Sequence, residues 1–375
     1  MKFNLSTLQT AVADMTKSAN KARAWNSSFF ISTEKVNGTT YLTILFNGAE
    51  ISGERKVPVL DSKDPISCTA PIRELATAVA AIPQREEIEV VVDGNQLLFK
   101  YGKDSVIRCP LLPETSPPLQ IPDVVESVVW GPGVLQSLAK QVPYFAGNPD
   151  DMQRKSKPQY GGIHISKNET DEVYVQCTDA IVGTRIQINK LGWGSTPMSL
   201  PFIPAIAEAM PNDAEIEIGF PADYNVVIVK GGYTTLVSRV YLGEYSDFTK
   251  FFNFTFPKLS VDKHYLIDLC KRVRNLNKLQ NQTSNTVTFR VQDGKLFAEI
   301  PQHLFERVPC TFDDGLSDFK VDFNRLEMVA SFLRVEKEGA GEIDLFCHPD
   351  NRAPITIMSP DDERVKCFLM PVTLR

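Results

Sequence analysis

The segment Glu87-Ile88-Glu89-Val90 occurs twice more along the chain, with small changes, as Glu215-Ile216-Glu217-Ile218 and Glu342-Ile343-Asp344-Leu345. Each copy follows a short helix-like stretch and precedes a hairpin-like turn. The copies begin at positions 87, 215 and 342 of 375 residues, so the interval is close to one third of the chain. Solenoid and propeller repeats are only about 20–50 residues long, whereas a compact domain commonly has about 100–150. The interval therefore predicts a triplicated domain.

Each third contains the same order of expected elements: a helix, strands, a second helix and three more strands. Turn residues lie between the last strands, where hairpins need them. We therefore expect an α+β fold with three domains, at residues 1–125, 126–253 and 254–375. The leading helices are expected at residues 6–21, 132–144 and 261–278, the second helices at 71–82, 201–210 and 324–335, and the last strands at 105–112, 235–242 and 365–370.

The composition is that of an ordinary soluble globular protein, with 43% hydrophobic and 23% charged residues. No apolar run approaches the ~20 residues that cross a bilayer, and the first residues lack the long apolar core of a signal peptide. We therefore expect a cytoplasmic protein. The seven cysteines show no CxxC spacing, which favours free thiols.

The net charge of −6 argues against a protein whose whole surface coats nucleic acid. Any contact with DNA would have to be local, and the helix expected at 261–278 offers such a face. At ~100° per residue, four basic residues share about one quarter of its circumference: Lys263, Lys271, Arg274 and Lys278. Five apolar residues lie opposite: Leu266, Leu269, Cys270, Val273 and Leu276. The alternative is a solvated basic face that has no partner.

The other leading helices and two basic segments add similar positive charge. Contacts of this kind reach phosphates, which give affinity without sequence information. The pattern therefore favours a protein that tracks along DNA without sequence preference. The residues expected to contact DNA are Lys17, Lys21, Arg23, Arg73, Lys140, Arg154, Lys155, Lys157, Lys263, Lys271, Arg274 and Lys278.

The sequence lacks the common catalytic and nucleotide-binding motifs, including GxxxxGK[ST], GxGxxG, HExxH and GxSxG. Its four histidines are isolated and have no metal-ligand spacing. We expect a protein that is not an enzyme and that needs no cofactor or metal. The alternative is an enzyme such as a hydrolase on the repeated framework, which would need a deep pocket and a perturbed titratable residue.

Three segments resemble the bacterial replicative sliding clamp, the beta subunit of DNA polymerase III. The ending Cys367-Phe368-Leu369-Met370-Pro371-Val372-Thr373-Leu374-Arg375 is similar to the terminal strand of that family and its Met-Pro-x-Arg-Leu motif. The segment Ser238-Arg239-Val240-Tyr241-Leu242-Gly243-Glu244-Tyr245-Ser246-Asp247-Phe248 is similar to its Arg-Leu-x-Asp-Gly-x-Phe-Pro-Asp-Tyr region. Cys177-Thr178-Asp179, followed by Gly183-Thr184-Arg185-Ile186, resembles its Thr-Asp-Gly-His-Arg-Leu motif. Together with the triplication, the resemblance covers the whole chain.

The resemblance implies a head-to-tail homodimer whose six domains close a ring around double-stranded DNA. Helices would line the central channel and antiparallel sheets would form the outside. The implied partners are DNA, bound without sequence specificity, and the replicative DNA polymerase and clamp loader, bound through short linear peptides. The implied location is a bacterial cytoplasm or an infected host cell, with no membrane partner.

The resemblance also implies a hydrophobic pocket for these peptides between the middle and last domains. Met and aromatic side chains suit an adaptable apolar groove. The alternative is that Phe368 and Met370 alternate in and out of an ordinary edge strand. Carried over by position, the pocket residues are Tyr160, Thr178, Gly183, Arg185, Ile186, Ser246, Lys250, Phe251, Phe368, Met370, Pro371, Val372, Thr373 and Leu374.

The chain also departs from the family's pattern. Ser246 stands where the family usually has Pro, Thr373 stands where it has Arg, and residues 180–182 are inserted within the Thr-Asp motif. These departures indicate a divergent clamp, for which a phage or plasmid origin and an altered peptide preference are hypotheses. The alternative function is a clamp-derived interaction scaffold that does not encircle DNA.

Overall fold

The computed structural model describes residues 1–21, 28–62, 64–84, 86–113, 119–148, 151–152, 156–188, 191–194, 196–200, 203–241, 244–279, 285–335 and 341–373. Four of the residues expected to contact DNA or a peptide lie outside these ranges: Arg23, Arg154, Lys155 and Leu374.

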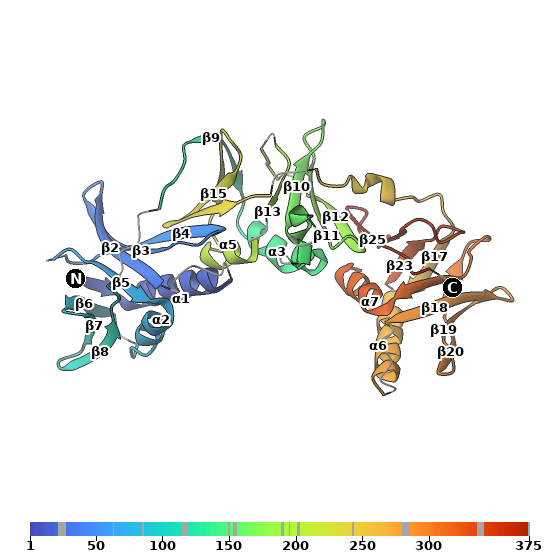
Figure 1. The fold of residues 1–375 in the computed structure, drawn as a ribbon, viewed down its shortest axis with the longest axis horizontal. Coiled ribbons are helices and arrows are strands. Elements are labelled where there is room, and N and C mark those ends of the chain that lie inside the picture. Colours follow the sequence, from blue (N-terminus) through green and yellow to red (C-terminus); the bar gives the residue numbers. More distant parts are fainter. Residues whose placement is uncertain are drawn as a thin grey trace. The chain divides into compact units, whose positions relative to one another are not determined.

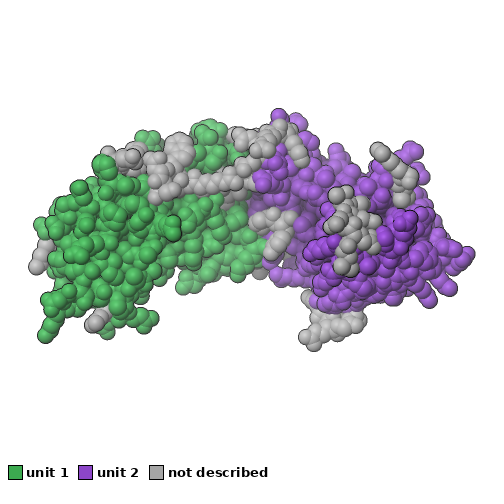
Figure 2. Space-filling model, turned by 60° about the horizontal axis from the view of Figure 1, so that its bottom comes forward, with its two compact units in different colours: residues 1–140, 192–242 green, residues 141–191, 243–375 purple. Residues whose placement is uncertain are grey.

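The chain forms two compact units (Figure 2). Unit 1 contains residues 1–140 and 192–242, and unit 2 contains residues 141–191 and 243–375. Each unit therefore combines one terminal third of the chain with part of the middle third. The domain boundaries expected after residues 125 and 253 stay a prediction based on the repeat, because the compact units follow the sheets that join neighbouring thirds.

The expected α+β architecture is confirmed, and the same order of elements occurs three times (Figure 1). The first repeat consists of β1 (Lys2–Asn4), α1 (Leu5–Lys21), β2 (Ser28–Val36), β3 (Thr39–Phe46), β4 (Ile51–Pro58), β5 (Ser67–Pro71), α2 (Ile72–Ala80), β6 (Glu87–Asp93), β7 (Gln96–Tyr101) and β8 (Ser105–Pro110).

The second and third repeats follow the same plan, and the third has one additional strand, β21. The second consists of β9 (Val124–Trp130), α3 (Val134–Gln141), β10 (Ile163–Lys167), β11 (Val173–Thr178), β12 (Val182–Ile188), β13 (Met198–Leu200), α5 (Ile203–Ala209), β14 (Ile216–Pro221), β15 (Val226–Gly231) and β16 (Thr234–Arg239). The third consists of β17 (Lys258–Asp262), α6 (Lys263–Leu279), β18 (Thr286–Gln292), β19 (Lys295–Ile300), β20 (Leu304–Arg307), β21 (Cys310–Phe312), β22 (Phe319–Asp322), α7 (Phe323–Phe332), β23 (Glu342–Phe346), β24 (Ile355–Met358) and β25 (Val365–Leu369).

Unit 1 contains two antiparallel sheets. One has the strand order β1-β6-β7-β8, and the other has the order β5-β2-β3-β4-β16-β15-β14-β9. In the second sheet, β4 of the first repeat pairs with β16 of the second repeat. This pair joins the two repeats into one continuous sheet.

Unit 2 is built by the same rule. Its strands follow the order β10-β11-β12-β25-β24-β23-β17-β21, and a separate sheet has the order β20-β19-β18-β22. Here β12 of the second repeat pairs with β25 of the third. We call the strand pairs β4–β16 and β12–β25 the first and second join. In each join, a glycine lies directly opposite a large apolar residue: Gly53 opposite Leu236, and Gly183 opposite Phe368.

Three of the described helices, α1, α6 and α7, begin at residues whose side chains cap them. Asn4 accepts a hydrogen bond from the backbone N–H of Thr7, Asp262 accepts one from Tyr265, and Asp322 accepts two, from Asn324 and Arg325. Such caps satisfy N–H groups that have no partner within the helix. Apolar residues then recur every three or four positions and are buried, as on α1 with Leu5, Leu8, Ala11, Val12, Met15 and Ala19.

Two of the expected leading helices differ from the structure. The expected start at Val261 is wrong, because Val261 pairs in β17 with Ile343 and Cys310, and Asp262 starts the helix at Lys263. A strand of three to seven residues precedes every leading helix, and the sequence pattern did not indicate it. The helix expected at 132–144 is also shorter: Gly133 has a φ of 75°, and the α-helix ends at Gln141 before Pro143, which has no N–H to donate.

No helix within the described ranges is long and apolar enough to span a membrane.

The glycine in the first join generates a test of the fold. A Cβ atom at Gly53 would lie 2.2 Å from Leu236 Cδ2 and 3.0 Å from Phe46 Cε1, and both side chains are fully buried. Gly53→Val should therefore overpack the join and lower the free energy of unfolding of unit 1 by about 1–3 kcal/mol. Urea unfolding followed by tryptophan fluorescence reports unit 1, because the two tryptophans among the described residues, Trp130 and Trp193, belong to it.

Glu54→Val is the matched control, since Glu54 is the next residue of β4, points to the opposite face and is partly exposed. An unfolding midpoint for Gly53→Val equal to that of the control would contradict the expected clash.

Candidate functional site

The basic face of α6 is only partly available to a ligand. Lys271 and Lys278 are exposed, although Lys271 Nζ lies 3.3 Å from Asp268 Oδ1. Lys263 donates a hydrogen bond of 2.6 Å from Nζ to the Leu333 carbonyl, and burial lowers its pKa. The Arg274 guanidinium donates to Asn324 Oδ1 and pairs with Glu327. Lys263 and Arg274 are therefore engaged in packing α6 against the rest of unit 2.

The apolar face of α6 is largely as expected. Leu266, Leu269, Cys270 and Val273 are buried. Leu276 is only partly buried, and Asn277 is buried instead.

The remaining residues expected to contact DNA are divided between the units. In unit 1, Lys17 on α1, Arg73 on α2 and Lys140 on α3 are exposed, whereas Lys21 pairs with Glu208 at 2.6 Å. In unit 2, Lys157 is exposed, but its Nζ lies 5.6 Å from the centre of the Tyr160 ring. Lys157 therefore belongs with the residues expected to bind peptides.

The described residues that are expected to bind peptides lie in unit 2, around the join between β12 and β25. Gly183 of β12 faces Phe368 of β25, and a Cβ atom at Gly183 would lie 2.5 Å from the Phe368 ring. Only glycine fits at this position. Because β25 lies between β12 and β24 in the sheet, the alternative of an ordinary edge strand is wrong.

Phe368 is the centre of an aromatic cluster. Its ring is 1% exposed and contacts the rings of Phe248 and Phe251 at centroid distances of 5.0 Å, and that of Phe252 at 6.4 Å. The last three residues belong to the linker between the second and third repeats. Phe251 is partly exposed, so it rather than Phe368 presents the cluster to solvent.

A second group of polar and aromatic residues lies beside this cluster. The Tyr160 hydroxyl forms a short hydrogen bond with Ser246 Oγ, and the Tyr160 ring packs edge-on against Tyr245. The imidazole of His164 stacks on Tyr245 with ring centres 4.1 Å apart. Burial lowers the pKa of His164 to about 4 and raises the pKa of Tyr245. Ser246, at a position where the resembled family usually has Pro, thus has a hydrogen-bond partner in Tyr160.

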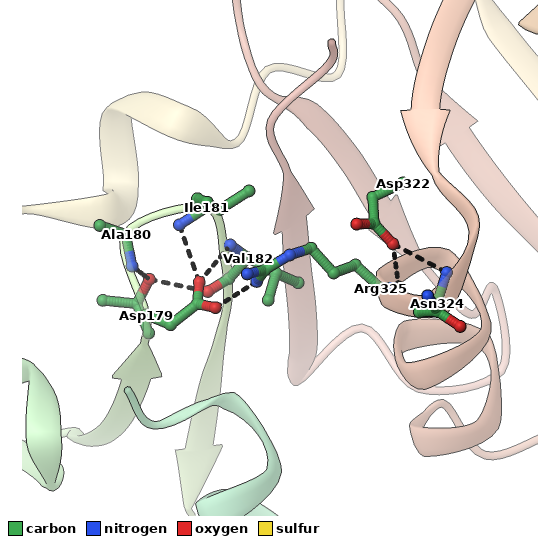
Figure 3. A network of polar contacts seen from close by, with 8 residues as sticks. Asp179, Ala180, Ile181, Val182, Asp322, Asn324 and Arg325 are labelled. Atoms are coloured by element: carbon green, nitrogen blue, oxygen red, sulfur yellow. Dashed lines mark hydrogen bonds and ion pairs between the residues drawn. The ribbon is translucent and has the colours of Figure 1, made fainter. Parts of the chain in front are cut away.

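The turn between β11 and β12 is fixed by a network of polar contacts (Figure 3). Asp179 Oδ1 accepts hydrogen bonds from the backbone N–H groups of Ile181 and Val182, and Asp179 Oδ2 pairs with the Arg325 guanidinium of α7. Asp322 caps the helix that carries Arg325. The residues inserted at 180–182 therefore form a turn that is tied to the third repeat.

The end of the chain follows this turn closely. The backbone N–H of Met370 donates to the Ile181 carbonyl at 2.8 Å, and that of Val372 donates to the Lys320 carbonyl at 2.7 Å. Met370, Pro371 and Val372 are partly exposed, and Ile181 is 44% exposed. These side chains and Phe251 form the apolar part of the candidate site.

The other expected residues surround this apolar part. Thr178 is buried, and its hydroxyl donates to the Val182 carbonyl and accepts from the Ala180 N–H. Ile186 is 8% exposed, and Thr373 is exposed. The Arg185 guanidinium lies 3.7 Å from the centre of the Tyr174 ring, and Lys250 Nζ lies 5.5 Å from that of Phe251.

Sequence reasoning missed several residues of the site: His164, Tyr245, Phe248, Ile181 and Arg325. The phenylalanine-rich segment after Asp247 could have indicated an aromatic cluster. No sequence signal indicates that Arg325 reaches Asp179, which is 146 positions away. Among the described residues, no three His, Cys, Asp or Glu side chains are grouped so that they could hold a metal ion.

The buried imidazole of His164 makes the stability of unit 2 dependent on pH. In the unfolded chain the pKa of His164 is about 6.5. Between pH 6.5 and about pH 4, His164 is therefore protonated in the unfolded state and neutral in the folded state. Stability is therefore complete above pH 6.5 and decreases as the pH falls, by at most about 3 kcal/mol. His164→Phe, which keeps a ring on Tyr245, should remove this part of the decrease.

The measurement is urea unfolding at several pH values between 7.5 and 4.5, followed by circular dichroism. His264→Phe is the control, because His264 is exposed. Identical pH dependence for the wild type and His164→Phe would show that His164 does not contribute.

Comparison with known proteins finds no relative by sequence. No protein-family model matches the chain. No curated protein gives a significant match either.

Comparison with solved structures does find similar proteins. The DNA polymerase III beta subunit from Thermotoga maritima superposes with a TM-score of 0.82 at 16% identity, covering 100% of this chain and 99% of the other. The beta chain from Streptococcus pneumoniae gives 0.82 at 17% identity with the same coverage. A sliding clamp from Pseudomonas aeruginosa, bound to griselimycin, gives 0.80 at 15% identity, again covering 100% and 99%. The chain therefore has the fold of the bacterial DNA polymerase III beta subunits over its whole length.

Proposed function

We propose that this protein is a DNA sliding clamp, a processivity factor that closes as a head-to-tail homodimer around duplex DNA and tethers a replicative polymerase and other replication proteins. The fold shared with polymerase III beta subunits supports this function. The role needs no catalytic group, since a closed ring holds its DNA by topology. The replicative polymerase and the clamp loader are the proposed protein partners.

The observation that carries the proposal is the rule by which the repeats join. The fourth strand of one repeat pairs with the last strand of the next: β4 with β16, and β12 with β25. Within the described residues, only one fourth strand and one last strand lie at the edge of their sheet. These are β20, the fourth strand of the third repeat, and β8, the last strand of the first repeat. Applied once more, the rule pairs β20 of one chain with β8 of a second chain.

Such an interface is heterologous, and two copies of it close a ring of six repeats. It also removes exposed sheet edges, which would otherwise favour uncontrolled association. Both edges present apolar side chains to solvent: Phe305 on β20 is 57% exposed, and Val106 on β8 is 36% exposed. The alternative is an interaction scaffold that does not encircle DNA, for which these edges would stay unpaired.

The oligomeric state tests this proposal. The wild type should have twice the chain mass of 41.9 kDa in light scattering coupled to size exclusion. Phe305→Asp and Val106→Asp should each give a monomer, because each places a charge at the interface. An equimolar mixture of the two variants should recover a dimer, since each contributes one intact edge to a single intact interface.

Tyr233→Asp is the control, because Tyr233 is 56% exposed and lies on the turn between β15 and β16, which belongs to neither edge strand. A monomeric wild type would favour the scaffold. A mixture that stays monomeric would refute the head-to-tail arrangement.

The exposed basic residues of α6 provide a second test, of DNA contact. Lys271→Ala with Lys278→Ala should weaken retention on a closed circular duplex and lower the slope of log affinity against log salt by about 1 for each lysine. Lys263→Ala should instead lower stability and leave the slope unchanged, because Lys263 bonds to Leu333.

Lys103→Ala with Lys295→Ala is the control, since both lysines are exposed on hairpins between strands. Equal salt slopes for the α6 double variant and this control would remove α6 from the proposed DNA-contacting surface.

A further inference from the structure

Four basic side chains around the candidate peptide site share one arrangement: each lies over the face of an aromatic ring. Such contacts hold a cation in place at the surface without neutralising its charge. The pairs are Lys157 with Tyr160 at 5.6 Å, Arg185 with Tyr174 at 3.7 Å, Lys250 with Phe251 at 5.5 Å, and Lys366 with Phe254 at 5.2 Å.

None of these four side chains has a carboxylate of the described residues within 4 Å. Other arginines of unit 2 do have such partners, as Arg325 has Asp179 and Arg274 has Glu327. The Nε of Arg185 is moreover buried and has no hydrogen-bond partner among the described residues. A buried donor of this kind normally has a partner, so Arg185 has a donor that no acceptor of the described residues uses.

The four cations lie around the same surface. Arg185 and Lys366 are directly opposite each other on the paired strands β12 and β25. Lys250 belongs to the linker whose Phe251 ring contacts Phe368 of β25. Lys157 lies over Tyr160, which bonds to Ser246 of the same linker.

Two carboxylates lie near these cations, and both are used within the fold. Asp247 accepts the backbone N–H of Thr249 at 2.8 Å, and hydrogen bonding from Thr249, together with the charges of Arg185 and Lys250 farther away, lowers the pKa of its carboxyl. Glu172 accepts hydrogen bonds from the side chains of Asn168, Tyr174 and Gln187. The site thus combines an apolar part, formed by Phe251, Ile181, Met370 and Val372, with cations that have no carboxylate of the described residues within 4 Å.

We propose that this site selects acidic peptides, in which carboxylates lie on either side of an apolar anchor. The anchor would contact the apolar part, and the carboxylates would pair with Arg185, Lys250, Lys366 and Lys157. The apolar part favours a peptide over a nucleic acid, because phosphates would engage the cations and leave Met370 and Ile181 unused. This inference rests on the proposed function and specifies the chemistry of its partners.

Three ten-residue peptides test the proposal. All three contain the same central Leu-Phe pair, and they differ only in the three residues placed around it, which are Asp in the first peptide, Ser in the second and Lys in the third. In fluorescence anisotropy with the full-length protein, the Asp peptide should bind about tenfold more tightly than the Ser peptide, and the Lys peptide most weakly. The difference should largely disappear near 0.5 M salt, where the screening length is about 4 Å.

Lys250→Ser with Lys366→Ser should reduce the preference for Asp over Ser to about twofold or less. Lys103→Ser with Lys295→Ser removes the same charge from exposed hairpins and should keep the preference.

Equal affinities for the three peptides would overturn the selectivity while the proposed clamp function stands. Binding of none of them would overturn the peptide site as well. Displacement of the Asp peptide by a short DNA duplex, lost in the Lys250/Lys366 variant, would assign the cations to nucleic acid instead.

Discussion

Antiparallel pairing between strands of neighbouring repeats is the interaction on which the rest of this structure depends. A repeat ends on both sides in strands whose N–H and C=O groups need partners, and β4–β16 and β12–β25 supply them. Both joins place a glycine opposite a large apolar side chain, so the backbones approach closely and the apolar group fills the space. Each compact unit therefore contains strands from two neighbouring repeats and does not coincide with a single repeat.

The candidate peptide site is a consequence of the second join. Gly183 makes room for the Phe368 ring, and Phe368 packs against Phe248, Phe251 and Phe252 of the linker. The insertion at residues 180–182 becomes a turn whose Asp179 is held by Arg325 of the third repeat. The chain end then bonds to that turn through Met370. The site thus contains residues from both repeats because the sheet that carries it contains both.

The distribution of charge separates basic residues that stabilise the fold from basic residues that stay available. Arg274, Arg325 and Lys21 each pair with a carboxylate within the fold. Lys271, Lys278 and Lys140 remain exposed on helices. Around the candidate peptide site, Arg185, Lys250 and Lys366 have no carboxylate of the described residues within 4 Å and lie over aromatic rings instead. Basic residues without a close carboxylate thus occur in a chain whose net charge is −6, so they do not reflect an overall surplus of lysine and arginine.

The sequence by itself determined the triplication, the α+β class and the buried faces of the helices, because repeat length and apolar spacing are local properties of the chain. It also indicated the segments around Thr178, Ser246 and Met370 by their resemblance to a family. The sequence could not show that Val261 belongs to a strand, that Lys263 and Arg274 are occupied, or that Arg325 holds Asp179. Only the tertiary structure decided these points, because each depends on a partner that lies 49 to 146 positions away, and periodicity specifies which face of an element is buried but not which element covers it.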